Sequence, residues 1–172
     1  MKDQKQLNDK MLLPFKGRRL QLMVTTTLCK PSVRTTSECL LVNIYRQQAT
    51  WPLLENILLQ WYRNQSFVYL KNRTIFWAAK IGVSFKRICV KDQRSRWGSC
   101  STLHNLNYNW RIIMAPEPVI DYLIIHEVSH LVHFNHSTHF WGLVSIHDPL
   151  YQEHRLWLKK NGSQLFQVLP HN

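Results

Sequence analysis

Apolar and polar residues alternate along one segment of the chain, from residue 106 to residue 114. Apolar side chains fall on one side, and Asn107, Asn109 and Arg111 fall on the other, although Ile113 breaks the pattern. An alternation with a period of two is typical of a half-buried strand. We therefore predict one strand over residues 106–114.

Other segments have the composition of strands. Residues 18–46 are rich in Thr, Val, Leu and Ile, and the break at Lys30-Pro31-Ser32 predicts two strands joined by a turn. Residues 83–90 predict a further strand. Residues 1–17 predict a loose polar lead-in, so we expect a single domain over residues 18–172 with a strand-rich N-terminal part.

Two segments follow the helical period instead. Residues 51–69 carry apolar side chains at helical spacing, with Pro52 near the start, where a helix tolerates proline. Residues 119–134 are apolar nearly all round, which is typical of a helix buried on most sides. Together with the strands, these helices predict an α+β fold that is built on a small antiparallel or mixed sheet.

The charge balance adds a possible partner. The chain has 172 residues, of which 45% are hydrophobic, so one compact domain is expected. The 22 Lys and Arg outnumber the 10 Asp and Glu, and the resulting net charge of +12 attracts polyanions. A solvated basic surface is the preferred interpretation over a specific nucleic-acid role, and the charge also predicts weak nucleic-acid binding.

The N-terminus gives an expectation about location. Its first ten residues are mostly polar or charged, and no apolar segment typical of a secretory signal follows them. The longest apolar stretches are only a few residues, too short to span a membrane. The four cysteines form no C-x-x-C pair. We therefore expect a cytoplasmic protein with reduced thiols and no membrane partner.

The buried helix carries the candidate chemistry. His126, Glu127 and His130 form an H-E-x-x-H motif in its middle, where ionisable groups without a partner are costly. Four residues are just over one helical turn, so both imidazoles project from one face and can bind one metal ion. Glu127 lies about 100° further round the helix, where it can reach a metal-bound water and take its proton. The motif predicts one catalytic Zn²⁺ with Glu127 as the base.

A catalytic zinc usually has three protein ligands. His136 is the preferred third ligand, because it follows His126 by ten residues. Asn135 is predicted to end the helix in the left-handed conformation, and Ser137 is predicted to cap a second helix, so that the chain can return His136 to the other two histidines. His139 and Glu153 remain as alternatives.

This constellation predicts a zinc-dependent metallohydrolase, and specifically a peptidase that acts on a protein or peptide substrate. The substrate would add as a strand to residues 106–114, and Tyr108, His139 and His147 are candidate oxyanion donors. The rival hypothesis is a nucleic-acid-associated protein with the same fold and little or no turnover.

Several further motifs surround the H-E-x-x-H, and together they resemble the YgjP-like metallopeptidase family. The segments that carry the resemblance lie between about residue 50 and residue 165 and include Arg94–Ser101, Leu106–Arg111, Ala115-Pro116, Val119–Tyr122, Asn135–Ser137, Phe140-Trp141, Pro149, Tyr151, Arg155 and Trp157–Gly162. Gly98 is interpreted as a turn residue, with Trp97 packed under the sheet. The alternative is that the segment Arg94–Cys100 lines the substrate groove or contacts a phosphate.

The resemblance implies a zincin-like α+β fold related to SprT-type peptidases. It also implies that His126, His130 and His136 bind zinc and that Glu127 is the catalytic base. SprT-like relatives include DNA-dependent proteases, which gives the basic charge a possible meaning.

Overall fold

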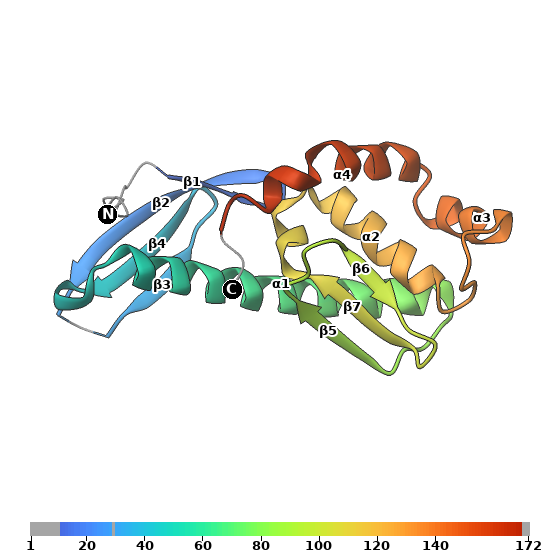
Figure 1. Cartoon of the computed structure of the whole chain (residues 1–172), viewed down its shortest axis with the longest axis horizontal. Helices are drawn as coiled ribbons and strands as arrows, with labels where there is room; N and C mark the ends of the chain where they lie inside the picture. The colour runs from blue at the N-terminus through green and yellow to red at the C-terminus, as the bar shows by residue number, and fades with distance from the viewer. Residues whose placement is uncertain (1–10, 29, 170–172) are drawn as a thin grey trace.

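The computed structural model describes residues 11–28 and 30–169, and it contains two small sheets placed along one long helix (Figure 1). The elements are, in chain order, β1 (Leu12–Phe15), β2 (Arg18–Thr27), β3 (Ser32–Thr35), β4 (Cys39–Tyr45), η1 (Arg46–Gln48), α1 (Trp51–Ile81), β5 (Arg87–Lys91), β6 (Gly98–Cys100), β7 (Asn105–Asn109), η2 (Trp110–Met114), α2 (Glu117–Ser129), α3 (Thr138–His147) and α4 (Tyr151–Leu165). The predicted α+β class with small mixed sheets is confirmed.

The N-terminal sheet has the strand order β1-β2-β4-β3, in which β2 and β4 run parallel and the outer pairs are antiparallel. The predicted two strands of residues 18–46 are therefore three, because the chain turns a second time before Cys39. The predicted loose lead-in is wrong for Leu12–Phe15, whose Leu13 and Phe15 are buried in the core. The rest of it up to residue 10 lies outside the described residues, and the single domain over 18–172 stays a prediction.

Helix α1 is longer than its predicted range and runs past both sheets (Figure 1). It has 31 residues and buries Leu54, Leu58, Tyr62 and Leu70. No Gly or Pro follows Pro52 before Gly82, which adopts φ 79° and ends the helix in the left-handed conformation that glycine favours. One helix thus contributes to the core beside each sheet.

The second sheet has the order β5-β7-β6, with β5 parallel and β6 antiparallel to β7. The strand predicted at residues 83–90 begins only at Arg87. The strand predicted at residues 106–114 is wrong in its second half, since it ends at Asn109 and continues as the 3-10 helix η2. It is also the central strand, so its two edges are already paired and cannot receive a substrate strand.

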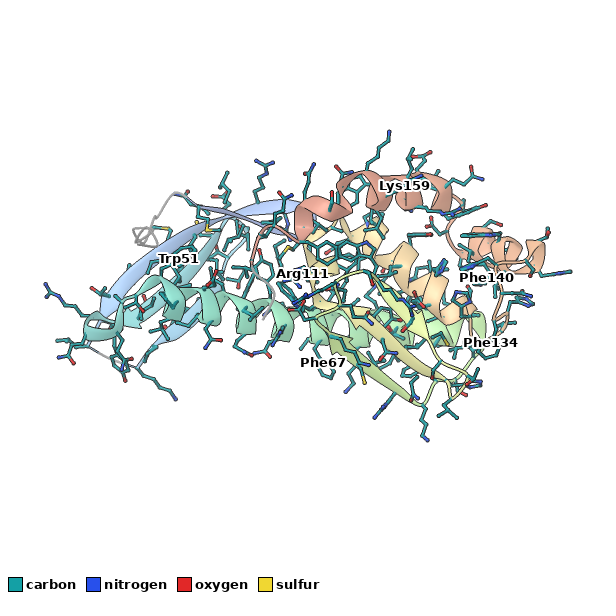
Figure 2. The ribbon with its side chains drawn as sticks, in the orientation of Figure 1. Trp51, Phe67, Arg111, Phe134, Phe140 and Lys159 are labelled. Carbon is teal, nitrogen blue, oxygen red and sulfur yellow. The ribbon has the colours of Figure 1, made fainter. Side chains whose placement is uncertain are left out.

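The side chains of η2 explain why the alternation misleads. Residues 110–114 are all buried, including Arg111, so no polar side faces water. The Asn109 side chain accepts a hydrogen bond of 3.1 Å from the Arg111 backbone N–H, which starts the 3-10 turn. The Arg111 guanidinium is bound by Asp92 and donates to the Leu169 carbonyl at 3.1 Å, at the centre of the molecule (Figure 2). A buried, paired arginine thus occupies a position that the pattern assigned to solvent.

Helix α2 lies between the three-stranded sheet and α4, and α3 follows beyond the C-terminal end of α2 (Figure 1). Its residues Ile120, Ile124 and Val128 are completely buried or nearly so, as the apolar sequence predicts. None of the helices within the described residues is long and apolar enough to cross a bilayer.

Candidate metal centre

The C-terminal end of α2 places the two histidines of the H-E-x-x-H motif. The helix ends at Ser129, earlier than the predicted residue 134, and His130 is its C-cap residue. The His133 backbone N–H bonds to the Ser129 carbonyl at 3.0 Å, so the chain leaves the helix through a tight turn. This turn brings the His133 carbonyl to 3.0 Å from His130 Nδ1. Because a carbonyl only accepts, Nδ1 carries the proton and Nε2 keeps its lone pair for a metal.

The chain then returns towards α2 and adds His136. The helix-ending role predicted for Asn135 is wrong, because Lys16 and His104 are the only non-glycine residues with positive φ in the described part of the chain. The predicted cap is confirmed, since the Ser137 hydroxyl accepts from the Phe140 backbone N–H at 3.4 Å and α3 begins at the next residue. His136 thereby lies between two fixed helix ends.

The three imidazoles converge on one point. One ligand atom of each of His126, His130 and His136 lies within 4.8 Å of the others, and the two Nε2 atoms of His126 and His136 are 3.1 Å apart. Within residues 11–28 and 30–169 no other group of three His, Cys, Asp or Glu converges in this way. Such convergence of nitrogen atoms is the donor set that zinc favours.

Aromatic side chains of α3 hold the histidine rings. Phe140, which is completely buried, stacks on His130 with ring centroids 4.5 Å apart (the residue is labelled in Figure 2). Trp141 stacks on His136 at 5.5 Å and 20°. The rings are therefore positioned by packing before any ligand binds, which lowers the entropy cost of metal binding.

The electrostatics of the centre favour neutral imidazoles. Burial lowers the pKa of His126 to about 3, with further lowering by the neighbouring His130, His136 and Arg155. Burial likewise lowers the pKa of His130. A neutral imidazole is the form that binds a metal ion, so these residues are ready to act as ligands at neutral pH.

Glu127 lies under the edge strand β6. It is 4% exposed, and burial raises the pKa of its carboxyl to about 8. Its Oε2 is buried and has no hydrogen-bond partner among the described residues. A buried carboxylate oxygen is costly without a partner, so this group fits a site that receives a metal-bound water.

Gly98 of β6 makes room for that carboxylate. A Cβ at this position would lie 2.5 Å from Glu127 Oε1, far inside van der Waals contact. The interpretation as a turn residue is wrong, because Gly98 lies in a strand and its φ is not positive. The glycine is required for space, which only the three-dimensional contact between β6 and α2 reveals.

The other candidates lie elsewhere. His139 is exposed on α3 with its ring 6.1 Å from that of His133, and Glu153 is exposed on α4; neither belongs to the convergent group. Of the oxyanion candidates, Tyr108 is completely buried and bonded to Thr74 at 3.2 Å, and His147 packs 6.2 Å from the Trp77 ring. Sequence reasoning gave no role at the centre to Arg155, whose charge acts on His126.

The α+β fold, the H-E-x-x-H helix and the three converging histidines define the class of a metallopeptidase. The YgjP-like, metallopeptidase domain family matches residues 1–161 of this sequence. The chain therefore belongs to the YgjP-like metallopeptidase family, and the resemblance drawn from its motifs is confirmed.

Two other comparisons accompany this assignment. The crystal structure of the metallopeptidase zymogen of Pyrococcus abyssi abylysin matches with 18% sequence identity and a TM-score of 0.48, over 52% of this chain and 93% of that chain. Among proteins with curated descriptions, none matches the chain significantly.

Proposed function

We propose that this chain is a zinc-dependent peptidase with one metal ion, bound by His126, His130 and His136. The observation that carries the proposal is the convergence of the three imidazoles within 4.8 Å on the helix end that also holds Glu127, a buried carboxylate whose Oε2 has no partner among the described residues. Three nitrogen ligands leave a fourth position open, as in catalytic zinc sites, whereas structural sites are closed by four protein ligands. Membership of a metallopeptidase family supports the same reaction class.

The residues of the chain divide the work of the reaction. Zinc, when bound, acts as a Lewis acid towards the scissile carbonyl and makes a water molecule acidic. Glu127 accepts the proton of that water at its carboxylate and later delivers it to the leaving amine. The His133 carbonyl holds the His130 ring in the tautomer that presents Nε2. Strand β6 shields Glu127 from bulk water, which strengthens its interactions inside the site.

An extended peptide would add to the three-stranded sheet at its edge strand β6 and not at the central strand β7. Strand β6 pairs with β7 on one side and forms the outer edge of the sheet on the other. It crosses directly over Glu127, since the space beside Gly98 is filled by that carboxyl group. A peptide that adds to β6 by backbone hydrogen bonds would therefore pass next to the catalytic base.

The identity of the third ligand is tested by metal content. We expect about one zinc per chain in the wild type, and His136→Ala should lower zinc affinity at least ~10-fold because it removes one of three ligands. His139→Ala and Glu153→Ala are the matched controls and should bind zinc like the wild type. Competition with a chromophoric chelator measures the affinities. A larger loss in Glu153→Ala than in His136→Ala would show that the ligand set is wrong.

A nucleic-acid-associated protein with little turnover is the second candidate, and one surface favours it. Exposed cations follow one another around β5 and β6, namely Lys86, Arg87, Lys91, Arg94 and Arg96. The acid in this segment, Asp92, is already bound by Arg63 and Arg111. None of these five cations forms an ion pair within the described residues, so they give the surface around β5 and β6 a positive charge, which suits a phosphate backbone.

This surface predicts salt-dependent binding of DNA. We expect weak binding that falls steeply between 50 and 200 mM salt, as counterion release requires. The double variant Arg94→Gln/Arg96→Gln should reduce the slope of log K against log salt by about 2 if both residues contact phosphates. Arg34→Gln/Arg46→Gln, in β3 and η1 of the N-terminal part, is the control with the same change in net charge. Equal effects of both pairs, measured by fluorescence anisotropy, would mean that no local interface exists.

A further inference from the structure

Arg155 lies near the metal centre, on the side where α3 and α4 meet. Arg155 lies in the second turn of α4, and its Cζ is 4.9 Å from the centroid of the Trp141 ring. The Trp141 ring lies 5.7 Å from the His126 ring and 5.5 Å from the His136 ring. The guanidinium is therefore one aromatic ring away from two of the three metal-binding residues.

Among the described residues, no acid is paired with this arginine. Among the ion pairs of the described residues, none includes Arg155. Asp148, which lies between α3 and α4, is bound by His154 at 2.9 Å and not by Arg155. The side chain is exposed and its planar group is held by the Trp141 ring, so its N–H edge is available to a ligand.

The positive charge of Arg155 lies close to a site that would hold a metal cation, so a bound anion would stabilise it. The guanidinium and a metal cation bound by the histidines would carry charges of the same sign, and among the described residues no carboxylate forms an ion pair with Arg155. A ligand carboxylate relieves that repulsion and matches the fork of the guanidinium with two parallel hydrogen bonds. The chemistry at this position therefore suits a ligand that carries a carboxylate.

We propose that Arg155 is a specificity-determining residue that binds a carboxylate of the peptide substrate beside the metal centre. This inference rests on the proposed peptidase function and deepens it by naming the substrate class. The carboxylate belongs either to an Asp or Glu side chain or to a free C-terminus, and these two sources offer the same chemistry. The alternative role for Arg155 is to brace Trp141 and, through it, the ligand His136.

The test uses zinc-loaded full-length protein with Glu127→Gln, so that peptides bind without being hydrolysed. Three pools of random hexapeptides are passed over the immobilised protein and the retained peptides are quantified by mass spectrometry. One pool is C-terminally amidated with one fixed Glu, one has a free C-terminus and no acidic side chain, and one is amidated with no acidic side chain. We expect at least one of the first two pools to be retained about 10-fold or more over the third, which is the range of a charged hydrogen bond.

Arg155→Gln in the same background should abolish this preference, and Arg155→Lys should keep only part of it because ammonium cannot form the fork. Lys159→Gln is the control, since Lys159 extends outward from the same helix (Figure 2). Zinc affinity should be the same in all variants. The proposal is wrong if Arg155→Gln keeps the wild-type preference or loses retention of all three pools equally. It is also wrong if Arg155→Gln lowers zinc affinity, because Arg155 would then support Trp141 and the ligand His136.

The two proposals fail separately. Retention of carboxylate peptides that depends on Arg155, together with no hydrolysis by the protein with Glu127 intact, would contradict the peptidase function alone. Hydrolysis of peptides with no carboxylate preference would contradict the role of Arg155 alone.

Discussion

Glu127→Gln should lower peptide hydrolysis at least ~10²-fold, the low end of the contribution of a general base. Glutamine keeps the size of the side chain and its hydrogen-bonding capacity, but it cannot accept the proton of a metal-bound water. Zinc content should remain at the wild-type value, because the three histidines that converge do not include this residue. Hydrolysis is measured with a pool of fluorogenic peptides, and zinc by elemental analysis of the same samples.

The stability of the variant separates a catalytic role from a structural one. The carboxyl group of Glu127 is buried and its Oε2 has no partner among the described residues, so it contributes little to folding. The Tm should therefore be unchanged or slightly higher, since the substitution removes a group that can ionise at a buried position. Loss of the fold or of zinc in Glu127→Gln would assign Glu127 to the support of the ligands. Unchanged hydrolysis with zinc retained would require a different base.

The metal centre could be read from the sequence because its geometry is local. His126 and His130 share a face through the helical period alone. His136 lies in the short connection between this helix and the helix that Ser137 caps, which restricts its position. The buried character of α2 could be predicted for the same reason, since its apolar residues surround the helix. Local rules therefore determine the candidate ligands, and the structure adds their distances.

The features that sequence reasoning missed depend on contacts between distant segments. Residues 110–114 keep an apolar pattern but form a 3-10 helix, because Arg111 is paired with Asp92 and not with water. The edge strand beside Glu127 is β6, and strand order is set by pairing partners, which hydropathy does not encode. Gly98 and Arg155 gain their meaning only from Glu127 and Trp141, which lie on other elements. Their presence among the family-like motifs was the available signal.

Gly98→Ala should abolish most of the hydrolytic activity without unfolding the protein. The new Cβ would lie 2.5 Å from Oε1 and 2.7 Å from Cδ of Glu127, distances that side chains do not tolerate. Gly98 is fixed by its pairing with Tyr108 of β7, whereas the end of the Glu127 side chain can rotate, so Glu127 is the group that moves. A displaced base cannot reach the metal-bound water, and we expect a loss of ~10²-fold or more with zinc retained.

Gly142→Ala is the matched control, because a Cβ at Gly142 meets nothing within 4 Å and the residue lies inside α3. It should leave hydrolysis unchanged and raise stability by up to ~1 kcal/mol, the helix preference for Ala over Gly. The double variant Gly98→Ala/Glu127→Gln decides between two routes of inactivation. If Gly98→Ala acts by displacing the base, the double variant is no less active than Glu127→Gln, because the same group is lost only once. A further loss of ~10²-fold in the double variant would contradict this mechanism and show that the methyl group instead blocks the peptide along β6.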